Sequence, residues 1–300
     1  MNHKLILSLL VAVVISSGTF AQLTILSGIK QATQYNIGQD ISTIVAKGLD
    51  YDVYNKETKG AMDSFNALTD PNSKFNLAII PSDLLYYMQA QDMRLNTEKT
   101  KNLKVLVPLE YQQIHLVTKA SENINSLRDL HGKNVAIGSS NQSTHLTASL
   151  IKDYTGIEWI SNKMPFDESY EALSKGDIDA FFVVSAAPIQ KLDINPQGMS
   201  ATDKLILVPL TDMSDWAEHY KLDSITTAEY KWLDHNVATY SVQGLLVVNE
   251  SKLDEMERND VKELRMALIA KYDLLKQNGN PIWTRINLKN WDPKAWPVFE

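Results

Sequence analysis

The sequence predicts an α/β protein in which strands and helices alternate over about two domains. Short apolar runs of strand length are followed repeatedly by segments whose apolar residues recur every three or four positions, as in a helix with one buried face. Such alternation favours a mostly parallel sheet covered by helices. A length of 300 residues suggests about two domains, yet no linker-like segment divides the chain. We therefore expect two lobes between which the chain crosses more than once.

The first 21 residues are predicted to be a secretory signal peptide. Lys4 supplies a positive charge, residues 5–15 form an apolar run, and Ala21 ends a small-residue cleavage pattern. The run is too short for a spanning helix, which needs about 20 apolar residues. No cysteine follows the cleavage site to carry a lipid. We expect an exported, soluble chain that is cleaved near Ala21 and retained in a periplasm.

The strands are predicted from short runs of apolar, mostly β-branched residues that end at turn signals. The run at 178–184 is the most hydrophobic of them. The expected strands are 23–27, 52–54, 75–80, 105–109, 114–118, 134–137, 178–184, 205–210, 237–242 and 245–249.

The helices are predicted from helical spacing and from capping residues. Ser82 and Asn259 stand where N-caps are expected, and Gly156, Gly176 and Gly279 stand where helices are expected to end. The expected helices are 35–49, 61–68, 83–89, 127–130, 146–156, 170–176 and 261–275.

Composition and motifs argue against several kinds of chemistry. The chain has no cysteine, which excludes disulfides, thiol catalysis and cysteine metal sites. Its net charge of −7 argues against non-specific nucleic-acid binding. No HExxH, GxSxG, GxGxxG or P-loop pattern occurs, and no two histidines lie three to five residues apart. We therefore expect no catalytic residue, no metal site and no cofactor.

One polar segment has the chemistry of a binding site. Residues 138–144 (GSSNQST) connect a predicted strand to a predicted helix and carry three serines, one threonine and two side-chain amides. Backbone N–H groups and the positive end of the helix dipole point to such a position and favour an anion. Simple N-capping by Ser143 or Thr144 is the alternative, although capping requires only one such residue.

Several sequence blocks keep a common order from about residue 23 to 250. The block at 124–138 (INSLRDLHGKNVAIG) is similar to one shared by several groups of periplasmic solute-binding proteins. Its neighbours are 75–83 (FNLAIIPSD), 107–117 (VPLEYQQIHLV), 176–188 (GDIDAFFVVSAAP), 225–230 and 237–247. Taken together in this order, the blocks resemble the TAXI family of substrate-binding subunits of TRAP transporters.

The resemblance implies the two-lobe fold of periplasmic binding proteins, with two crossover strands as a hinge and a ligand cleft between the lobes. Lobe one would comprise residues 22–115 and 240–300, and lobe two residues 116–239. The implied function is non-enzymatic capture of a small polar or anionic organic solute, such as a carboxylate or an amino acid, for delivery to a TRAP-type membrane permease. Binding of such a solute favours the closed arrangement, which alone contacts it from both sides.

The loops that would line the cleft depart from the family pattern. A glycine-rich first loop is replaced by Gly28–Tyr35, and the glycine that usually precedes a proline is Ala187. Large side chains such as Lys30, Gln34 and Gln142 are therefore expected to narrow the cleft or change its polarity. No arginine lies in these loops to clamp a carboxylate. The expected ligand contacts, among which Tyr35, Ser143 and Thr144 are favoured, are Tyr35, Thr58, Ser82, Ser140, Gln142, Ser143, Thr144 and Ser185.

Two alternatives to transport remain at the level of sequence. An exported enzyme on the same fold would use a carboxylate such as Asp83 or Glu110 facing the cleft, and a ligand-sensing subunit would report to a membrane receptor. Residues 282–299 form a separate feature, because they hold three of the six tryptophans. This tail is expected to pack on lobe one, and a partner-binding surface is the alternative.

Overall fold

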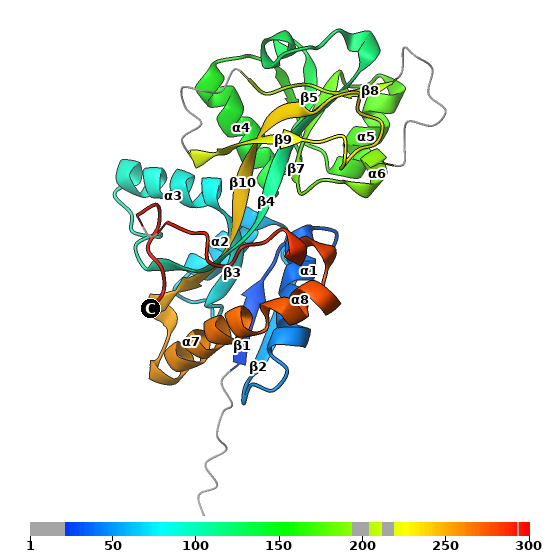
Figure 1. Cartoon of the computed structure of the whole chain (residues 1–300). Coiled ribbons are helices and arrows are strands. Elements are labelled where there is room, and N and C mark those ends of the chain that lie inside the picture. The colour runs from blue at the N-terminus through cyan, green and yellow to red at the C-terminus, as the bar shows by residue number, and fades with distance from the viewer. Residues whose placement is uncertain (1–21, 194–203, 212–218, 293) are drawn as a thin grey trace, which may run out of the picture.

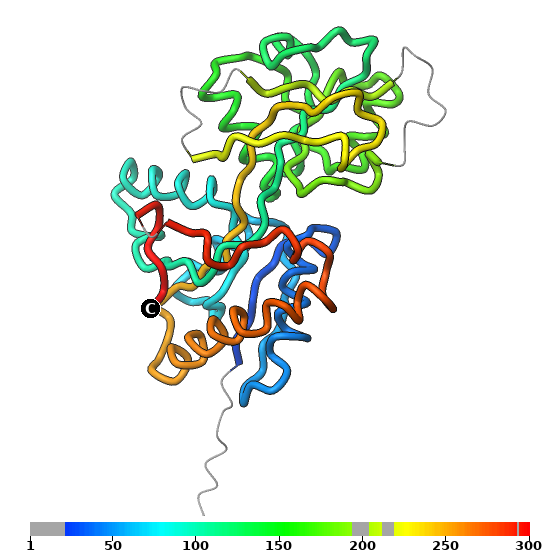
Figure 2. The backbone as a smooth tube through the Cα atoms, viewed as in Figure 1, coloured from blue at the N-terminus to red at the C-terminus, as the bar shows by residue number. Residues whose placement is uncertain are grey.

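The computed structural model describes residues 22–193, 204–211, 219–292 and 294–300, so the predicted signal peptide lies outside the described residues. Two α/β lobes lie one above the other and are joined by two long strands (Figures 1 and 2). These strands are β4 (Leu103–Lys119) and β10 (Val237–Asn249), which pair with each other and run through both lobes. The fold class predicted from the sequence is thereby confirmed.

The first lobe is built from the N-terminal part of the chain and its C-terminal part. Its strands are β1 (Gln22–Leu26), β2 (Asp52–Lys56) and β3 (Leu77–Pro81). Its helices are α1 (Thr33–Asp40), the π-helical turn η1 (Ile41–Val45), α2 (Ala61–Thr69), α3 (Ser82–Leu95), η5 (Glu250–Lys252), α7 (Glu255–Ala270), α8 (Tyr272–Asn278) and η6 (Pro281–Thr284).

The second lobe is formed by the middle of the chain. Its strands are β5 (Asn134–Ala136), β6 (Ile160–Asn162), β7 (Ala180–Ser185), β8 (Leu205–Leu207) and β9 (Lys221–Ile225). Its helices are η2 (Ala120–Glu122), η3 (Leu127–Leu130), α4 (Ser143–Thr155), α5 (Phe166–Lys175) and α6 (Gln190–Asp193).

A single mixed sheet passes through the molecule in the order β2-β1-β3-β10-β4-β7-β5-β6, with β8 beside β4 and β9 beside β10. The pairs of β1 with β2 and β3, and of β5 with β6 and β7, are parallel. Every pair that includes β4 or β10 is antiparallel. The expectation of a mostly parallel sheet was therefore wrong, because the two connecting strands run in opposite directions through its centre.

Each lobe buries apolar side chains on both faces of the sheet. In β3, Ile79 joins a cluster with α7 and the C-terminal tail, whereas Ala78 and Ile80 join a second cluster with α2 and α3. This alternation is the period-two pattern of a strand that is covered on both sides. In the second lobe, α4 covers one face and α5 covers the other.

The connecting strands differ from their predicted form. Residues 105–109 and 114–118 were expected to be separate strands, as were 237–242 and 245–249, but each pair belongs to one continuous strand. The polar residues between them, including Glu110 and Gln243, looked like a break but are buried. A register shift between Gln243 and Leu245 disturbs the ladder where the strands leave the first lobe.

Three helix starts also differ from the prediction. Ser82 lies inside α3, whose N-cap is Pro81, and the Ser82 hydroxyl instead accepts a hydrogen bond of 3.3 Å from the Gln243 backbone N–H. Helix α7 begins after Asp254, which forms a capping box with Glu257, so Asn259 is not its cap. The expected helix at 35–49 begins at Thr33 and changes to a π-helical turn at Ile41.

The C-terminal tail packs on the first lobe. The Trp283 side chain is fully buried, and its Nε1–H donates a hydrogen bond of 2.8 Å to Asp40. Further along, Trp296 Nε1–H donates to the Leu103 carbonyl at 2.9 Å, and the Phe299 N–H donates to the Val105 carbonyl at 3.0 Å. The tail therefore completes the core of the first lobe.

Candidate functional site

A cavity of about 400 Å³ lies between the lobes. Its walls come from the β1–α1 loop, the start of α2 and the end of β3 in the first lobe, and from β7 and the starts of α4 and α5 in the second. A volume of this size is within the range of small-molecule sites. The lining residues are Ser27–Ile29, Gln31–Gln34, Gly60, Ala61, Ile79, Pro81, Gly138, Gln142–Thr144, Pro165–Asp167, Phe182–Ser185 and Ile189.

Four helices begin at this cavity. The N-cap positions of α1, α2, α4 and α5 are Ala32, Gly60, Gln142 and Pro165, and all four residues line the cavity. None of these four caps accepts a side-chain hydrogen bond from its helix. Since the first turn of a helix carries N–H groups without intrahelical partners, these helix starts offer donors to a bound oxygen atom.

The lobes touch directly at one edge of the cavity. A side chain at Gly60 would place its Cβ 2.1 Å from the carbonyl oxygen of Asn141 in the other lobe, and Gly60 has a φ of +140°. The Met62 N–H donates to the same carbonyl at 3.3 Å. Glycine at this position therefore permits the starts of α2 and α4 to approach each other.

Four of the predicted contacts lie in the cavity wall: Gln142, Ser143, Thr144 and Ser185. The Thr144 hydroxyl accepts a hydrogen bond of 3.0 Å from the Val184 N–H and so fixes the start of α4 to β7. Gln142 Oε1 accepts from the Ser139 N–H at 2.9 Å, which closes the loop before the helix. The hydroxyl groups of Ser143, Thr144 and Ser185 and the side-chain N–H groups of Gln142 are neutral donors that the second lobe can offer to a ligand.

The other four predicted contacts are placed outside the lining of the cavity. Tyr35 belongs to α1, and its carbonyl accepts from Asn55 Nδ2 at 3.0 Å. The Thr58 hydroxyl lies 2.7 Å from that of Ser64, and Ser82 contacts β10. Ser140 lines a smaller side cavity of about 230 Å³, which shares Ala61, Gln142 and Ser143 with the main one.

Phe166, Asp167 and Phe182 are lining residues that the sequence did not indicate. Phe166 and Asp167 open α5 directly after Pro165, and a proline followed by an acidic first turn is a typical helix start. That signal locates the helix but not its position at the cavity, which depends on how α5 packs on β7. Phe182 was expected only as part of a buried strand.

The cavity lining is poor in ionisable groups. Asp167 is the only Asp, Glu, Lys, Arg or His among the described residues that line it, and Lys191 pairs with it at 2.8 Å. Lys30, which was expected to narrow the cleft, instead pairs with Glu57 at 3.7 Å. Elsewhere in the described part of the chain, no group of three or more His, Asp or Glu side chains is arranged to hold a metal ion.

The carboxylates considered for an enzyme do not line the cavity. Burial raises the pKa of Asp83 to about 6, and two hydroxyl groups of the second lobe cover it. Burial also raises the pKa of Glu110 to about 8. Glu110 packs against Gly244 between the connecting strands, and among the described residues its Oε2 has no hydrogen-bond partner. The interpretation of either residue as a carboxylate facing the cleft was therefore wrong.

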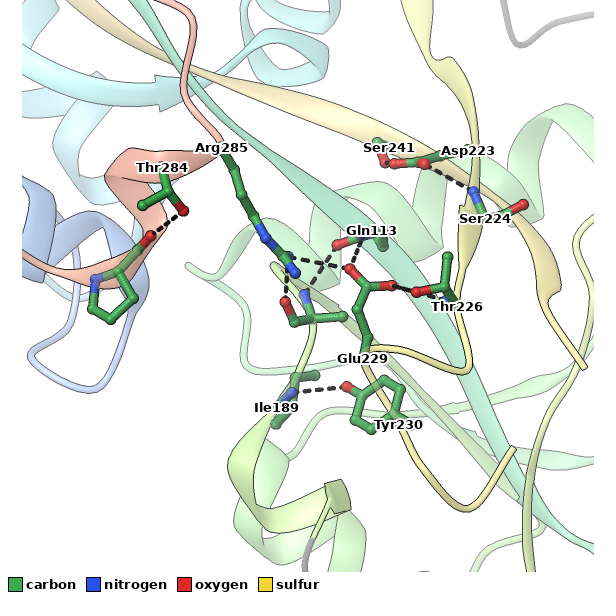
Figure 3. Close-up of polar contacts among 12 residues, drawn as sticks. Gln113, Ile189, Asp223, Ser224, Thr226, Glu229, Tyr230, Ser241, Thr284 and Arg285 are labelled. Carbon is green, nitrogen blue, oxygen red and sulfur yellow. Dashed lines mark hydrogen bonds and ion pairs between the residues drawn. The ribbon is translucent and has the colours of Figure 1, made fainter. Parts of the chain in front are cut away.

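A polar network beside the hinge joins the C-terminal tail to the second lobe (Figure 3). Arg285 donates to the Ala187 carbonyl at 2.5 Å and pairs with Glu229 at 3.1 Å. Gln113 of β4 contacts the same two residues, accepting from the Ala187 N–H at 3.0 Å and donating to Glu229 at 3.3 Å. The C-terminal tail and the connecting strand β4 therefore both hold the turn that follows β7.

Fold and cavity together define the architecture. Two α/β lobes joined by two long strands, with a cavity at their boundary, form the two-lobe fold of the periplasmic binding proteins. No helix in the described residues is both long and apolar enough to cross a bilayer.

The chain belongs to the NMT1-like family, whose model matches residues 25–291. Among solved structures it is similar to a periplasmic transporter, with 14% identity, a TM-score of 0.57 and coverage of 94% of this chain and 93% of the other. An ancestral arginine-binding protein bound to arginine has 15% identity, a TM-score of 0.50 and coverage of 88% and 95%. The periplasmic aliphatic sulphonate binding protein SsuA from Escherichia coli has 12% identity, a TM-score of 0.50 and coverage of 91% and 87%. The comparison with curated proteins gave no match.

Proposed function

We propose that this protein is an exported solute-binding protein that captures a small polar or anionic organic solute between its lobes and delivers it to a membrane permease. The observation that carries the proposal is the cavity with walls from both lobes, at which four uncapped helices begin. A ligand there contacts both lobes only when they are closed, so its binding favours closure.

The chemistry of the lining supports a ligand with one polar or singly charged end. Helix N-termini stabilise negative charge. The described lining residues include no lysine or arginine that could neutralise a second negative charge on the ligand. Ile79, Phe166 and Phe182 give the rest of the cavity an apolar surface. Ser143, Thr144, Gln142 and Ser185 are the proposed polar contacts of the second lobe.

The partner proposed from the sequence blocks is a TRAP-type permease, in keeping with the TAXI resemblance. In this proposal the chain is cleaved near Ala21 and works in the periplasm. Lobe one then comprises residues 22–115 and 240–300, and lobe two residues 116–239. The position of β4 and β10 supports this division, because each strand pairs within both lobes.

Native mass spectrometry of the purified protein tests the proposal directly. We expect a co-purified small molecule that is released on unfolding, binds again to the stripped protein and is recovered chemically unchanged. Ser185→Trp, which fills the cavity, is expected to abolish rebinding, whereas Ser161→Trp on the exposed strand β6 is a matched control that leaves it intact.

Conversion of the solute during incubation would contradict the proposal in favour of an enzyme. Uptake into membrane vesicles that carry a TRAP-type permease distinguishes transport from sensing. Binding without uptake would favour a sensory subunit.

A further inference from the structure

A second contact between the lobes lies apart from the cavity, at the start of α3. Asp83, the second residue of this first-lobe helix, receives hydrogen bonds on its Oδ2 from Thr147 of α4 at 2.7 Å and from Tyr220 at 3.3 Å. Both donors belong to the second lobe. The Leu84 N–H donates to the other carboxyl oxygen at 2.8 Å. Asp83 is only 2% exposed, so the second lobe covers it.

A carboxylate in this position lacks the partner that usually accompanies a buried charge. Among the described residues, no lysine or arginine forms an ion pair with Asp83. Removal from water disfavours the ionised form more than the three donors favour it, which raises the pKa from 3.8 to about 6. A protonated Asp83 still accepts hydrogen bonds from Thr147 and Tyr220, so the contact survives protonation.

Separation of the lobes would remove both hydroxyls and return Asp83 to water. We propose that Asp83 is a proton-sensitive latch, so that closure of the lobes takes up a proton and is favoured by mild acid. This inference rests on the proposed function for its purpose, because closure is the step that retains the solute.

The sign and size of the effect follow from the two states of the carboxyl group. Below about pH 4 the group is protonated whether the lobes are open or closed, and closure has its full stability. As the pH rises through about 6, the closed form must bury an ionised carboxylate, and that stability is lost. The closed-to-open ratio is expected to be about tenfold higher at pH 5 than at pH 7.5.

Other titratable groups lie around the latch and need controls. His219 of the second lobe stacks on Tyr86 of α3 with ring centroids 4.1 Å apart, and His145 of α4 has a pKa lowered by burial and by Lys163. Imidazole side chains in general can change charge between about pH 5 and 8, which includes the pH range of the test. Tyr154 acts electrostatically on Tyr220, whose own pKa is raised well above 10 by burial and by Asp83.

The test measures closure without any ligand. The chain has no cysteine, so spin labels can be attached at Met93→Cys in the first lobe and Ile160→Cys in the second, which are 78% and 56% exposed. Double electron–electron resonance then gives the closed and open populations between pH 5 and pH 7.5. We expect the wild-type ratio to rise about tenfold toward pH 5, and Asp83→Asn, which cannot ionise, to show no such change.

Retention of the wild-type pH response by Asp83→Asn would overturn the proposal, as would a flat wild-type profile. Thr147→Val gives a second readout, because loss of one donor to the carboxylate is expected to move the transition to higher pH. An unmoved transition would count against the latch. His219→Gln and His145→Gln are expected to keep the response, and loss in either would assign it to that imidazole.

The two proposals fail in different ways. A pH-dependent closure in a protein that retains no solute in native mass spectrometry would leave the latch intact and contradict the binding function. A protein that binds solute but whose closure does not depend on Asp83 would support the binding function and contradict the latch.

Discussion

The lobes meet at the cavity and at the polar network that joins the C-terminal tail to the second lobe. These two regions use different kinds of interaction. At the cavity, the polar groups are helix N-termini, hydroxyls and one amide, and only one ionisable side chain is present among the described lining residues. At the tail, Arg285, Glu229, Gln113 and Ala187 form a network of charged and neutral hydrogen bonds. Charged groups thus fix the lobes beside the hinge, while neutral donors are left for a ligand.

This contrast predicts that substitutions in the tail will lower stability, whereas substitutions in the cavity will lower affinity. Trp283→Ala is expected to have the largest effect. It removes a fully buried indole and its hydrogen bond to Asp40, and should lower the free energy of unfolding by about 3–5 kcal/mol. Urea denaturation provides the measurement, with Trp291→Ala, which is only half-buried, as the milder comparison. Equal losses for the two variants would contradict the anchoring role of Trp283.

Gly60→Ala is expected to have the largest effect at the cavity. Its Cβ would collide with the Asn141 carbonyl of the other lobe at 2.1 Å, so closure should be impaired and solute affinity should fall at least tenfold. Gly132→Ala is the matched control, since that glycine also has positive φ, meets nothing within 4 Å and lies outside the cavity lining. Calorimetric titration with the co-purified solute compares the two. Similar losses would show that backbone strain, and not contact between lobes, controls binding.

Arg285→Ala is expected to have a smaller effect. The arginine is 45% exposed, and Glu229 keeps hydrogen bonds from Gln113 and Thr226, so the loss should be about 1 kcal/mol or less. Arg285→Lys keeps the charge but not the forked geometry that reaches both partners. Denaturation curves of the two variants separate charge from geometry. Solute affinity is expected to change less than threefold in both variants. A larger loss of affinity would contradict the separation of a stabilising tail network from a ligand-binding cavity.

Ser185→Ala is expected to lower solute affinity alone. One neutral hydroxyl in the cavity wall is removed, so solute affinity should fall about threefold to tenfold without a change in unfolding. The same titration and denaturation experiments apply. A change in stability with unaltered affinity would place Ser185 in the framework and not among the ligand contacts.

The part of the site that could be predicted from sequence is the start of α4. Gln142, Ser143 and Thr144 crowd polar groups at a strand-to-helix turn, and such a local pattern carries its own chemical meaning. Phe166 and Asp167 reach the same cavity only because α5 packs across β7, and no local pattern encodes that contact. Tyr35 shows the reverse case, because a residue favoured as a ligand contact from the sequence lies outside the cavity lining.

The strands and helices were predicted better than their boundaries. The buried runs at 23–27 and 178–184 have enough apolar residues to identify them as strands. The break expected after Leu109 was wrong because Glu110, Gln112 and Gln113 are polar yet buried. Gln112 donates to Glu110 within the same strand, whereas Gln113 donates to Glu229 far along the chain. Local sequence cannot reveal a buried polar residue whose partner is supplied by tertiary structure.

The course of the chain through β4 and β10 has a consequence for the order of folding. The second lobe is built from one continuous stretch between these strands, whereas the first needs Val105 to meet Val298 near the C-terminal end. Contacts between residues so distant in sequence form slowly. We expect pulse-labelled hydrogen exchange to protect amides of α4 and β7 before those of β1 and β3. Simultaneous protection would contradict this order. A nascent chain therefore remains without a finished first lobe until residue 298 has been synthesised.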